Sequence, residues 1–389
     1  MKKKKIAIIA HACRFGGGLY GTLNLLQAFK NVAENEEVLL IHSAGYGYEQ
    51  IELPSGSQRY VYQGSHSPWA RQWFERVTLP KVIDAYNPDI ILGLANIGLT
   101  KPKVPQALFI RMPYLFYERK KYYPNVTLKE RIRFSALKNQ VKTSLCNGTD
   151  RVFVQTPVVQ ERFSNEFNFP KEQIKVLRLS APSDVQIPTD NTMPPIFKQT
   201  GNYFHVLLMT RYLTHRNPDI LISLCKRYGN DIRKNGIKFI TTITPGEHPF
   251  ATRFIQNISK NNFEDVIINV GKLSRFEVAQ YLANSQLLWL PTMMETLGFS
   301  FLEAMQMGTT IMAPDLDFAR YVCGDAAMYY DPWDIDFMFN CLLQLRNNDQ
   351  LRKQYVAQGK KELLDNSKFA KNWQEAAKHC MDSLREIAN

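Results

Sequence analysis

The chain has 389 residues, of which 45% are hydrophobic and 22% charged, a composition that excludes an intrinsically disordered or a largely membrane-embedded protein. At this length two domains are expected rather than one. The net charge of +12 favours anionic partners, such as nucleotide phosphates, acidic lipid headgroups or nucleic acid, and does not choose among them.

From the sequence we expect neither a targeting signal nor paired cysteines. No apolar run reaches the ~18 residues of a transmembrane helix, and the lysines after Met1 lead into only a short apolar run, so we expect no signal peptide. The 6 cysteines occur singly, without a C-x-x-C pair that would suggest a zinc or redox site. Reduced thiols in a cytoplasmic protein are therefore expected.

The first distinctive stretch is Gly16–Gly21, which contains the pattern G-x-G-x-x-G after the apolar run Ile6–Ala10. A dinucleotide-binding turn follows its strand almost directly and has an acidic residue after the next strand. Here the intervening loop is too long, and the next apolar run, Val38–His42, ends in His42-Ser-Ala-Gly45, which contains no acidic residue. We expect instead a glycine loop before a helix at Thr22–Lys30, which either lets an anion approach the backbone or serves only to turn the chain.

Short apolar runs alternate with amphipathic stretches along both halves, which predicts two α/β domains with parallel sheets. The strands expected in the first half are Ile6–Ala10, Val38–His42, Ile90–Leu94, Gln106–Ile110 and Arg151–Gln155. Those expected in the second half are Phe204–Met209, Ile237–Thr242, Val266–Val270, Leu287–Leu290 and Thr310–Ala313. The proline-rich stretch Ser180–Pro195 reads as an interdomain linker, and Gln344–Asn389 is expected to be helical throughout.

The most informative segment begins after the strand Leu287–Leu290. A helix is expected at Phe299–Met307, with Gly308 as its left-handed C-terminal cap and free N–H groups at its start, near Thr296 and Gly298. Glu295 precedes this helix, and Glu303 lies about one turn inside it. Carboxylates accept hydrogen bonds from hydroxyl groups and helix N–H groups bind phosphate, so a polyol attached to a diphosphate fits this segment.

A plainer interpretation makes Glu295 an acid favoured by the helix dipole and Glu303 a solvated surface residue. The apolar neighbours of Glu303 argue against it, because burying an unpaired carboxylate is costly.

Glu295 and Glu303 have the spacing E-x7-E. With the sequence that flanks them, they resemble the donor-binding region of the retaining glycosyltransferases of family four (glycosyltransferases group 1). The resemblance covers Phe204–Pro332 and reaches the N-terminal half only in outline. It implies an α/β protein of the GT-B fold, with two Rossmann-like domains facing a central cleft. The implied domains are an acceptor-binding domain at 1–190, a nucleotide-sugar-binding domain at 200–370, and a C-terminal helix at 371–389 that packs back on the first domain.

The resemblance also implies roles for individual residues. Arg211 and Arg216 match the family's basic pair, with arginine where lysine is usual at the second position, and would neutralise the donor diphosphate; the alternative is two surface arginines after a strand. Glu295 would hold the transferred sugar and act with them in catalysis, and Glu303 would bind the ribose hydroxyls. The full set of implied donor-binding residues is Gly17, Gly18, Thr296, Leu297, Gly298, Phe299 and Glu303.

By the same resemblance, the expected activity is transfer of a sugar from a nucleoside-diphosphate sugar to a glycan or lipid-linked acceptor, in cell-surface polysaccharide synthesis, with no cofactor. Alternatives are a sugar-nucleotide epimerase, another GT-B enzyme such as a phosphorylase, or a basic nucleic-acid-binding protein. The E-x7-E segment argues against the first two. The absence of an RNA-binding motif or a stacking platform argues against nucleic acid.

One position departs from the family pattern. Many relatives have a histidine after the fourth strand of the first domain, where this chain has Arg111. Arg111 is therefore a candidate for the catalytic group of that domain, and His11 and His66 are further candidates that could equally be loop or core histidines.

Metal and membrane binding are the remaining questions. The D-x-D triplets Asp315–Asp317 and Asp334–Asp336 could hold a divalent cation, but the second pair reads as helix caps and the two arginines already neutralise a diphosphate, so no metal is expected. The segment Leu128–Leu145 has an apolar face with basic residues elsewhere, preceded by the basic Arg119–Tyr123. It fits a helix on an anionic membrane, peripheral on the inner face of the plasma membrane, or equally a helix packed on the sheet.

Overall fold

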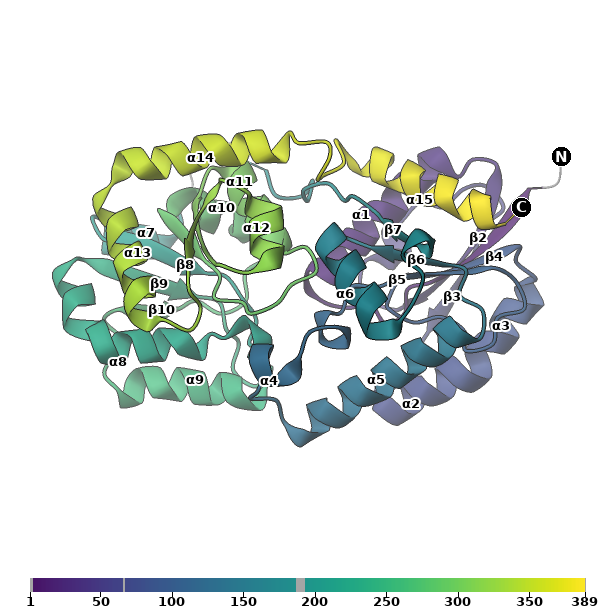
Figure 1. Ribbon diagram of the computed structural model, residues 1–389, viewed down its shortest axis with the longest axis horizontal. Helices are drawn as coiled ribbons and strands as arrows, with labels where there is room; N and C mark the ends of the chain where they lie inside the picture. Colours follow the sequence, from purple (N-terminus) through teal and green to yellow (C-terminus); the bar gives the residue numbers. More distant parts are fainter. Residues whose placement is uncertain (1–2, 66, 187–192, 389) are drawn as a thin grey trace. The chain divides into compact units, whose positions relative to one another are not determined.

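The computed structural model describes residues 3–65, 67–186 and 193–388 (Figure 1). The chain divides into two compact units. Unit 1 comprises Met1–Tyr117, Thr127–Ser180 and Ser367–Asn389, and unit 2 comprises Glu118–Val126 and Ala181–Asn366. Each unit is an α/β layer structure around one parallel sheet, as the alternating apolar runs predicted.

Unit 1 contains a seven-stranded sheet of order β3-β2-β1-β4-β5-β6-β7, with parallel pairing throughout. Its strands are β1 (Lys4–Ile9), β2 (Glu36–Ser43), β3 (Gln58–Tyr62), β4 (Ile90–Gly93), β5 (Gln106–Phe109), β6 (Arg151–Val154) and β7 (Ile174–Val176). The longer helices are α1 (Gly16–Val32), α3 (Leu79–Tyr86), α5 (Leu128–Cys146), α6 (Pro157–Phe167) and α15 (Trp373–Ile387). The shorter ones are η1 (Tyr48–Gln50), α2 (Pro68–Trp73), the π-helical η2 (Phe74–Thr78), η3 (Pro113–Leu115) and η4 (Lys171–Gln173).

The strands of unit 1 are apolar on both faces because helices cover both sides of a parallel sheet. Consecutive residues of β1, such as Ile8 and Ile9, are fully buried. One core cluster joins Ala7, Ile9 and Ile41 of the sheet to Leu79 and Ile83 of α3.

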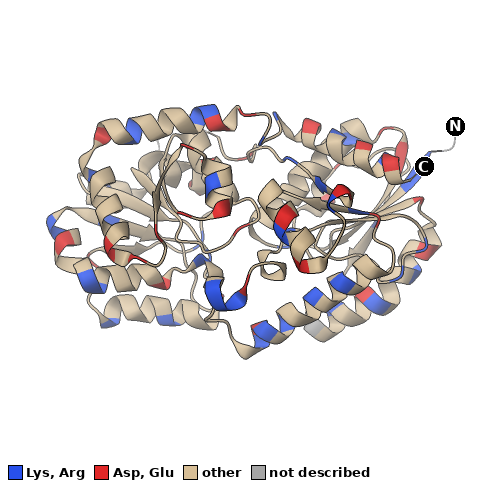
Figure 2. Cartoon of the chain, in the orientation of Figure 1, with Lys and Arg blue, Asp and Glu red and all other residues tan. Residues whose placement is uncertain are grey.

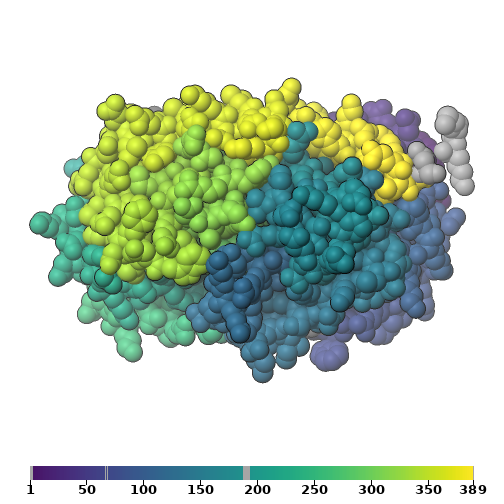
Figure 3. All heavy atoms as spheres, viewed as in Figure 1, coloured from purple at the N-terminus to yellow at the C-terminus, as the bar shows by residue number. Residues whose placement is uncertain are grey.

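Unit 2 contains a six-stranded parallel sheet of order β10-β9-β8-β11-β12-β13. Its strands are β8 (Phe204–Leu208), β9 (Ile237–Thr241), β10 (Ile267–Asn269), β11 (Leu287–Trp289), β12 (Thr310–Pro314) and β13 (Ala327–Tyr330). Its helices are α4 (Arg119–Tyr122), α7 (Pro195–Thr200), η5 (Thr214–Arg216), α8 (Asp219–Lys234), α9 (Pro249–Lys260), α10 (Arg275–Asn284), α11 (Phe299–Met307), α12 (Asp317–Cys323), α13 (Ile335–Asn347) and α14 (Asp349–Leu363). In Figure 3 the atoms of α14, in yellow, lie at the molecular surface.

The last helix, α15, belongs to unit 1 although it follows unit 2 in sequence. Arg385 of this helix donates to both carboxylate oxygens of Glu36, at 2.8 and 3.1 Å, and to the carbonyl oxygen of Val32 at the end of α1. Arg151 of β6 donates to the Ser383 hydroxyl of the same helix at 2.8 Å. These contacts attach the C-terminal helix to α1 and to the sheet of unit 1.

Two sequence predictions about helices were wrong. The glycine stretch is not a loop before a helix at Thr22, because α1 already begins at Gly16. The burial of Leu25, Leu26 and Phe29 provides the packing that overrides the low helix propensity of glycine. The C-terminal segment is also not helical throughout, since α14 begins after the capping residue Asn348 and α15 after Asn372.

Among the described residues, no helix combines the length and the apolar character needed to cross a membrane.

Candidate active site

The strand order of unit 2 reverses between β8 and β11, and ligands of open parallel sheets bind at the carboxyl end of such a switch point. A pocket is found there. Its lining comes from the segment after β8, the segment after β11 and the start of α11, and consists of Thr210, Arg216, Leu290, Pro291, Thr292, Glu295, Gly298, Ser300 and Phe301. Two of the predicted catalytic residues, Arg216 and Glu295, therefore lie in one pocket.

The start of α11 opens into this pocket. Gly298 is its N-cap, with φ +76, and a Cβ atom built there would lie 2.9 Å from Cδ2 of Phe301, so both the backbone and the space require glycine. No acidic residue occupies the first turn, and no side chain caps it. The N–H of Phe301 donates to the carbonyl oxygen of Gly298 at 2.9 Å. The N-terminal end of a helix carries a partial positive charge, so this end of α11 is suited to an anion. The helix bounds and the left-handed cap at Gly308 are confirmed as predicted.

Arg216 and Glu295 form an ion pair, with Nη2 of Arg216 3.0 Å from Oε1 of Glu295. Burial raises the pKa of Glu295, and the charge of Arg216 and a hydrogen bond from Thr292 oppose that rise. Nε of Arg216 is buried without a hydrogen-bond partner. The pair thus presents a cation with spare hydrogen-bonding capacity beside a carboxylate, next to a helix N-terminus.

The backbone around η5 fixes the position of Arg216. Asn217 adopts the left-handed conformation, with φ +49, and the carbonyl oxygen of His215 accepts a hydrogen bond of 2.7 Å from the N–H of Met293. Burial lowers the pKa of His215 well below its usual value, and Arg216 lowers it further, so this imidazole is neutral at pH 7. The hydrogen bond ties the segment after β8 to the segment after β11.

Arg211, the other predicted basic residue, is not among the pocket-lining residues. Its Nε atom donates to Glu247 at 3.1 Å, and Glu247 also accepts a hydrogen bond from the N–H of Tyr212. The side chain of Arg211 is 44% exposed. Glu247 could not be singled out from the sequence, because it follows Thr244-Pro-Gly in an ordinary turn.

Glu303 lies inside α11 and is only 3% exposed. Its Oε1 atom accepts a hydrogen bond of 2.8 Å from Nη1 of Arg275, and Arg275 also contacts Asp184. The burial and pairing of Glu303 contradict the interpretation as a solvated surface residue. Sequence reasoning missed Arg275 and Asp184. A basic residue directly after the capping Ser274 was the available signal for Arg275, because a helix N-terminus disfavours positive charge.

The other predicted donor residues of unit 2 flank the same helix start. Thr296 and Leu297 are buried, and Phe299 is the first residue of α11.

In unit 1 the strand order reverses between β1 and β4, and the glycine stretch follows β1. Nη1 of Arg111 donates to the carbonyl oxygen of Gly18 at 2.9 Å, and Nη2 donates to the hydroxyl of Thr22 and the carbonyl oxygen of Leu94, both at 2.6 Å. Arg111 thus connects Gly18, in the first turn of α1, to the residue that follows β4. None of these hydrogen bonds involves Gly17, which lies in the same turn. These contacts give Arg111 a role in positioning the glycine stretch.

The two histidine candidates of unit 1 are His11 and His66. His11 is buried, and its Nε2 atom lies 3.1 Å from Glu75. Its ring packs edge-on against Phe74 and Tyr62. Glu75 also accepts hydrogen bonds from other residues of unit 1, and His11 is accordingly a core histidine in this structure. His66 lies outside the described residues.

The aspartates of the two D-x-D triplets have protein partners. Asp315 accepts two hydrogen bonds from Arg320, at 2.7 and 2.8 Å, and Asp317 accepts one from the N–H of Phe318. Asp334 caps α13, as predicted. Asp336 is not a cap and instead contacts Arg227 and Tyr228. No cluster of three potential metal ligands occurs among the described residues.

The predicted amphipathic helix corresponds to α5. Its inward side is formed by Phe134, Leu137 and Val141, whereas Leu128 and Ile132 are 69% and 63% exposed. The helix therefore packs on unit 1 through its middle and leaves two large apolar side chains of its first turns uncovered.

The chain is similar to known proteins in part of its sequence and in its fold. Residues 191–379 match the family model described as glycosyl transferases group 1. The fold of the chain is similar to that of Anabaena HepE in complex with UDP-glucose (TM-score 0.71, 14% identity, covering 98% of this chain and 100% of that one). It is also similar to that of sucrose-phosphate synthase from Thermosynechococcus elongatus (TM-score 0.72, 15% identity, covering 99% of this chain and 99% of that one). A third similar structure is that of WaaG, a glycosyltransferase involved in lipopolysaccharide biosynthesis (TM-score 0.72, 14% identity, covering 96% of this chain and 98% of that one).

The structural similarity shows the fold alone, which is the GT-B fold that the sequence led us to expect. No curated protein sequence matches the chain.

Proposed function

Residues 191–379 belong to the glycosyl transferases group 1 family, and from this premise we propose that the protein transfers a sugar from a nucleoside-diphosphate-sugar donor to a glycan or lipid-linked acceptor with retention of configuration. The observation that carries the proposal is the Arg216–Glu295 pair at the open N-terminus of α11. A cation and helix N–H groups suit a diphosphate, and a carboxylate beside them suits sugar hydroxyls.

In the proposed reaction the bond between the anomeric carbon and the donor phosphate breaks, and the acceptor oxygen bonds to that carbon on the same face. The acceptor proton passes to the leaving phosphate oxygen. Arg216, together with Arg211, stabilises the negative charge that develops on the leaving diphosphate. Arg211 would exchange its contact with Glu247 for one with the donor, which its exposed side chain permits.

Glu295 and Glu303 divide the recognition of the donor. Glu295 and the N–H groups of Leu297, Gly298 and Phe299 hold the transferred sugar, and Glu303 binds the ribose. Thr296 is proposed to contact the donor from the same segment. HepE was solved with UDP-glucose, so uridine diphosphate sugars are the first donors to test.

The acceptor is proposed to bind to unit 1, and the reaction to take place at the inner face of the plasma membrane in the synthesis of cell-surface polysaccharide. The exposed Leu128 and Ile132 of α5 support a peripheral attachment. So do the basic residues that Figure 2 shows along α5, where Glu130 is the single acid.

The proposal is tested in two steps. A thermal-shift screen with nucleoside-diphosphate sugars should find a ligand that raises the melting temperature, since about 100 times the dissociation constant adds about 2.7 kcal/mol. Transfer to synthetic glycan and lipid-linked acceptors follows, with the anomeric configuration of the product read by NMR. An inverted product would contradict retention, and conversion of the donor to an epimer without acceptor would favour the epimerase alternative. Salt-sensitive retention on nucleic acid, with no response to nucleotide sugars, would favour the nucleic-acid-binding alternative.

A further inference from the structure

We propose that Arg275 is a positioning residue for nucleotide binding: anchored on Asp184, its guanidinium orients the buried Glu303 carboxylate towards the ribose hydroxyls of the donor. This inference rests on the proposed function, because it concerns the residue expected to bind the ribose.

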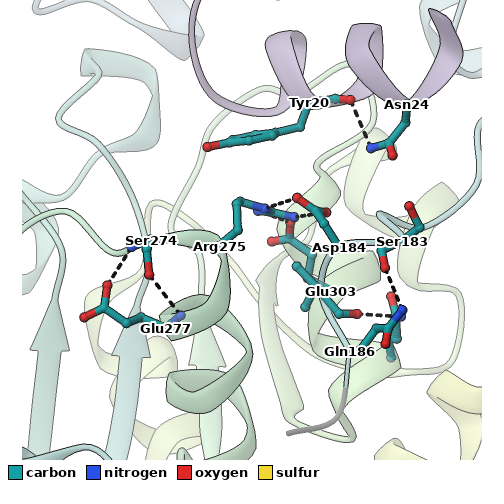
Figure 4. A network of polar contacts seen from close by, with 11 residues as sticks. Tyr20, Asn24, Ser183, Asp184, Gln186, Ser274, Arg275, Glu277 and Glu303 are labelled. Carbon is teal, nitrogen blue, oxygen red and sulfur yellow. Dashed lines mark hydrogen bonds and ion pairs between the residues drawn. The ribbon is translucent and has the colours of Figure 1, made fainter. Parts of the chain in front are cut away.

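Figure 4 shows Arg275 between the two carboxylates. Its Nε and Nη2 atoms donate to the two oxygens of Asp184 at 2.8 and 2.9 Å, and its Nη1 atom donates to Oε1 of Glu303 at 2.8 Å. A planar guanidinium that is forked on one carboxylate has a fixed orientation. The third hydrogen bond therefore points in a defined direction and fixes the Glu303 carboxylate with it.

The anchor itself is held in place. Asp184 belongs to the described stretch 181–186 of unit 2, and the next residue, Val185, accepts a hydrogen bond of 2.7 Å from Nε2 of Gln306. Gln306 and Glu303 are both on α11. The segment that carries Asp184 is thus attached directly to the helix that carries Glu303, and Arg275 closes the link from α10.

The position of Arg275 is not explained by the stability of its own helix. It is the first residue of α10, after the N-cap Ser274, which forms a capping box with Glu277. Positive charge at a helix N-terminus is unfavourable because it opposes the helix dipole. The two carboxylate partners account for an arginine at this place.

The pairing also affects the protonation of Glu303. Burial raises the pKa of Glu303, and the negative charge of Asp184 raises this pKa further. Arg275 lowers the pKa by its charge and its hydrogen bond, and the charge of Arg216 also lowers it. These three are the charged groups acting on Glu303, from α10, the 181–186 segment and η5. An ionised carboxylate accepts hydrogen bonds from two ribose hydroxyls at once, whereas a protonated one loses part of that capacity.

Removal of Arg275 should therefore leave Glu303 protonated at higher pH and free to rotate. Each pKa unit of further rise corresponds to about tenfold in the ionised fraction. We expect Arg275→Met to bind UDP about tenfold or more weakly at neutral pH, with the loss growing as the pH falls and shrinking as it rises. Arg275→Lys keeps the charge without the fork and should restore the pH dependence of the wild type but only part of its affinity.

The matched control is Arg233→Met. Arg233 is likewise forked on an aspartate, with Nε and Nη2 2.6 and 2.8 Å from the oxygens of Asp265, but it contacts neither glutamate of the site. This variant should bind UDP as the wild type does over the whole pH range.

The experiment is isothermal titration of UDP, with GDP and ADP as alternative probes, into the full-length wild type and these variants from about pH 5.5 to about pH 8.5. Should wild type bind a nucleotide while Arg275→Met shows the same affinity and pH profile, the inference is overturned and the proposed function stands. If the wild type binds none of the three, the proposed function fails, and this inference with it.

A second variant covers the case in which Arg275→Met does not fold. Asp184→Ala removes the anchor and leaves the guanidinium free to pair with both oxygens of Glu303. We expect weaker UDP binding whose loss does not grow as the pH falls, because Arg275 stays beside Glu303 and the charge of Asp184, which raises the pKa of Glu303, is removed. Unchanged affinity in Asp184→Ala would overturn the anchoring role.

Discussion

Glu295 and Glu303 are held by different cations, Arg216 and Arg275, and this difference separates their expected roles. Glu303→Ala should weaken the binding of a nucleoside diphosphate by about tenfold or more. A nucleoside diphosphate contains the ribose that Glu303 is proposed to bind, although it lacks the transferred sugar. Glu295→Ala should change that affinity little and mainly lower kcat, because its partner in the proposed reaction is the transferred sugar. Titration with the diphosphate and steady-state transfer measure the two effects, and an equal loss of diphosphate affinity in both variants would contradict the division.

The arginines are expected to act mainly in the transition state, where charge develops on the leaving diphosphate. Arg216→Met and Arg211→Met should each lower kcat by a factor on the order of 100 to 1,000, as the loss of one preorganised donor does. Arg216→Lys should have a smaller effect because the charge is kept. A change confined to KM for the donor would identify these residues as binding groups and contradict the proposed role. Arg253→Met, which alters an exposed arginine outside the pocket lining, is the control.

At the level of secondary structure, the sequence predicted best where apolar runs are continuous. The ten expected strands are present with bounds shifted by one or two residues, and α11 begins and ends as predicted. The three strands that were missed, β3, β7 and β13, lie at sheet edges. β3 is exposed over Gln58 and Arg59, so it shows no buried pattern, and β7 has only three residues.

The candidate site could be predicted only in part, for a physical reason. The spacing of Glu295 and Glu303, and the position of Arg216 after a predicted strand, are local sequence patterns from which a donor site could be predicted. The partners Arg275 and Asp184 come from elements distant in sequence, and such pairings arise from tertiary packing rather than from any local pattern. The same holds for Arg111, whose contacts with Gly18 and Leu94 depend on the order of the strands.

The start of α11 should be sensitive to a single methyl group. In Gly298→Ala the new Cβ would be attached to a left-handed backbone and would lie 2.9 Å from Cδ2 of Phe301. We therefore expect this variant to lower the free energy of unfolding by about 1–3 kcal/mol and to bind the donor more weakly. Gly246→Ala is the control, because Gly246 has φ +80 with no atom within 4 Å of the added Cβ. Urea unfolding and donor titration measure both effects. Equal unfolding free energies with unchanged donor affinity in the two variants would show that the contact with Phe301 is unimportant.

For the whole molecule, we expect transfer activity to persist in excess EDTA. In the proposed reaction the arginines and the N-terminus of α11 would supply the positive charge that a metal ion could otherwise bring to the diphosphate. Asp315 and Asp336, which the D-x-D triplets offer as ligands, are engaged by arginines. Steady-state rates before and after chelation test this, and activity that vanished with EDTA and returned with Mn²⁺ would reopen the metal question.

The attachment of the whole molecule to a membrane is expected to depend on the apolar side chains that unit 1 leaves uncovered. Besides Leu128 and Ile132, Trp69 and Trp73 of α2 are 83% and 63% exposed. Tryptophan favours the membrane interface. The basic helix α5 lies beside α2 in the same unit, since Gln140 of α5 donates a hydrogen bond to Glu75, which follows α2. We expect the protein to bind vesicles rich in phosphatidylglycerol and to leave vesicles of phosphatidylcholine unbound.

Vesicle flotation of variants locates this attachment. The double substitution of Leu128 and Ile132 by serine should reduce binding several-fold, and substitution of Trp69 and Trp73 by serine should reduce it further, because each removes apolar area from the interface. Binding should also weaken with salt, as an electrostatic contribution requires. The control is Leu364→Ser, which alters an exposed leucine of unit 2. Equal binding of both vesicle types, or no difference between these variants and Leu364→Ser, would show that α2 and α5 do not face a membrane.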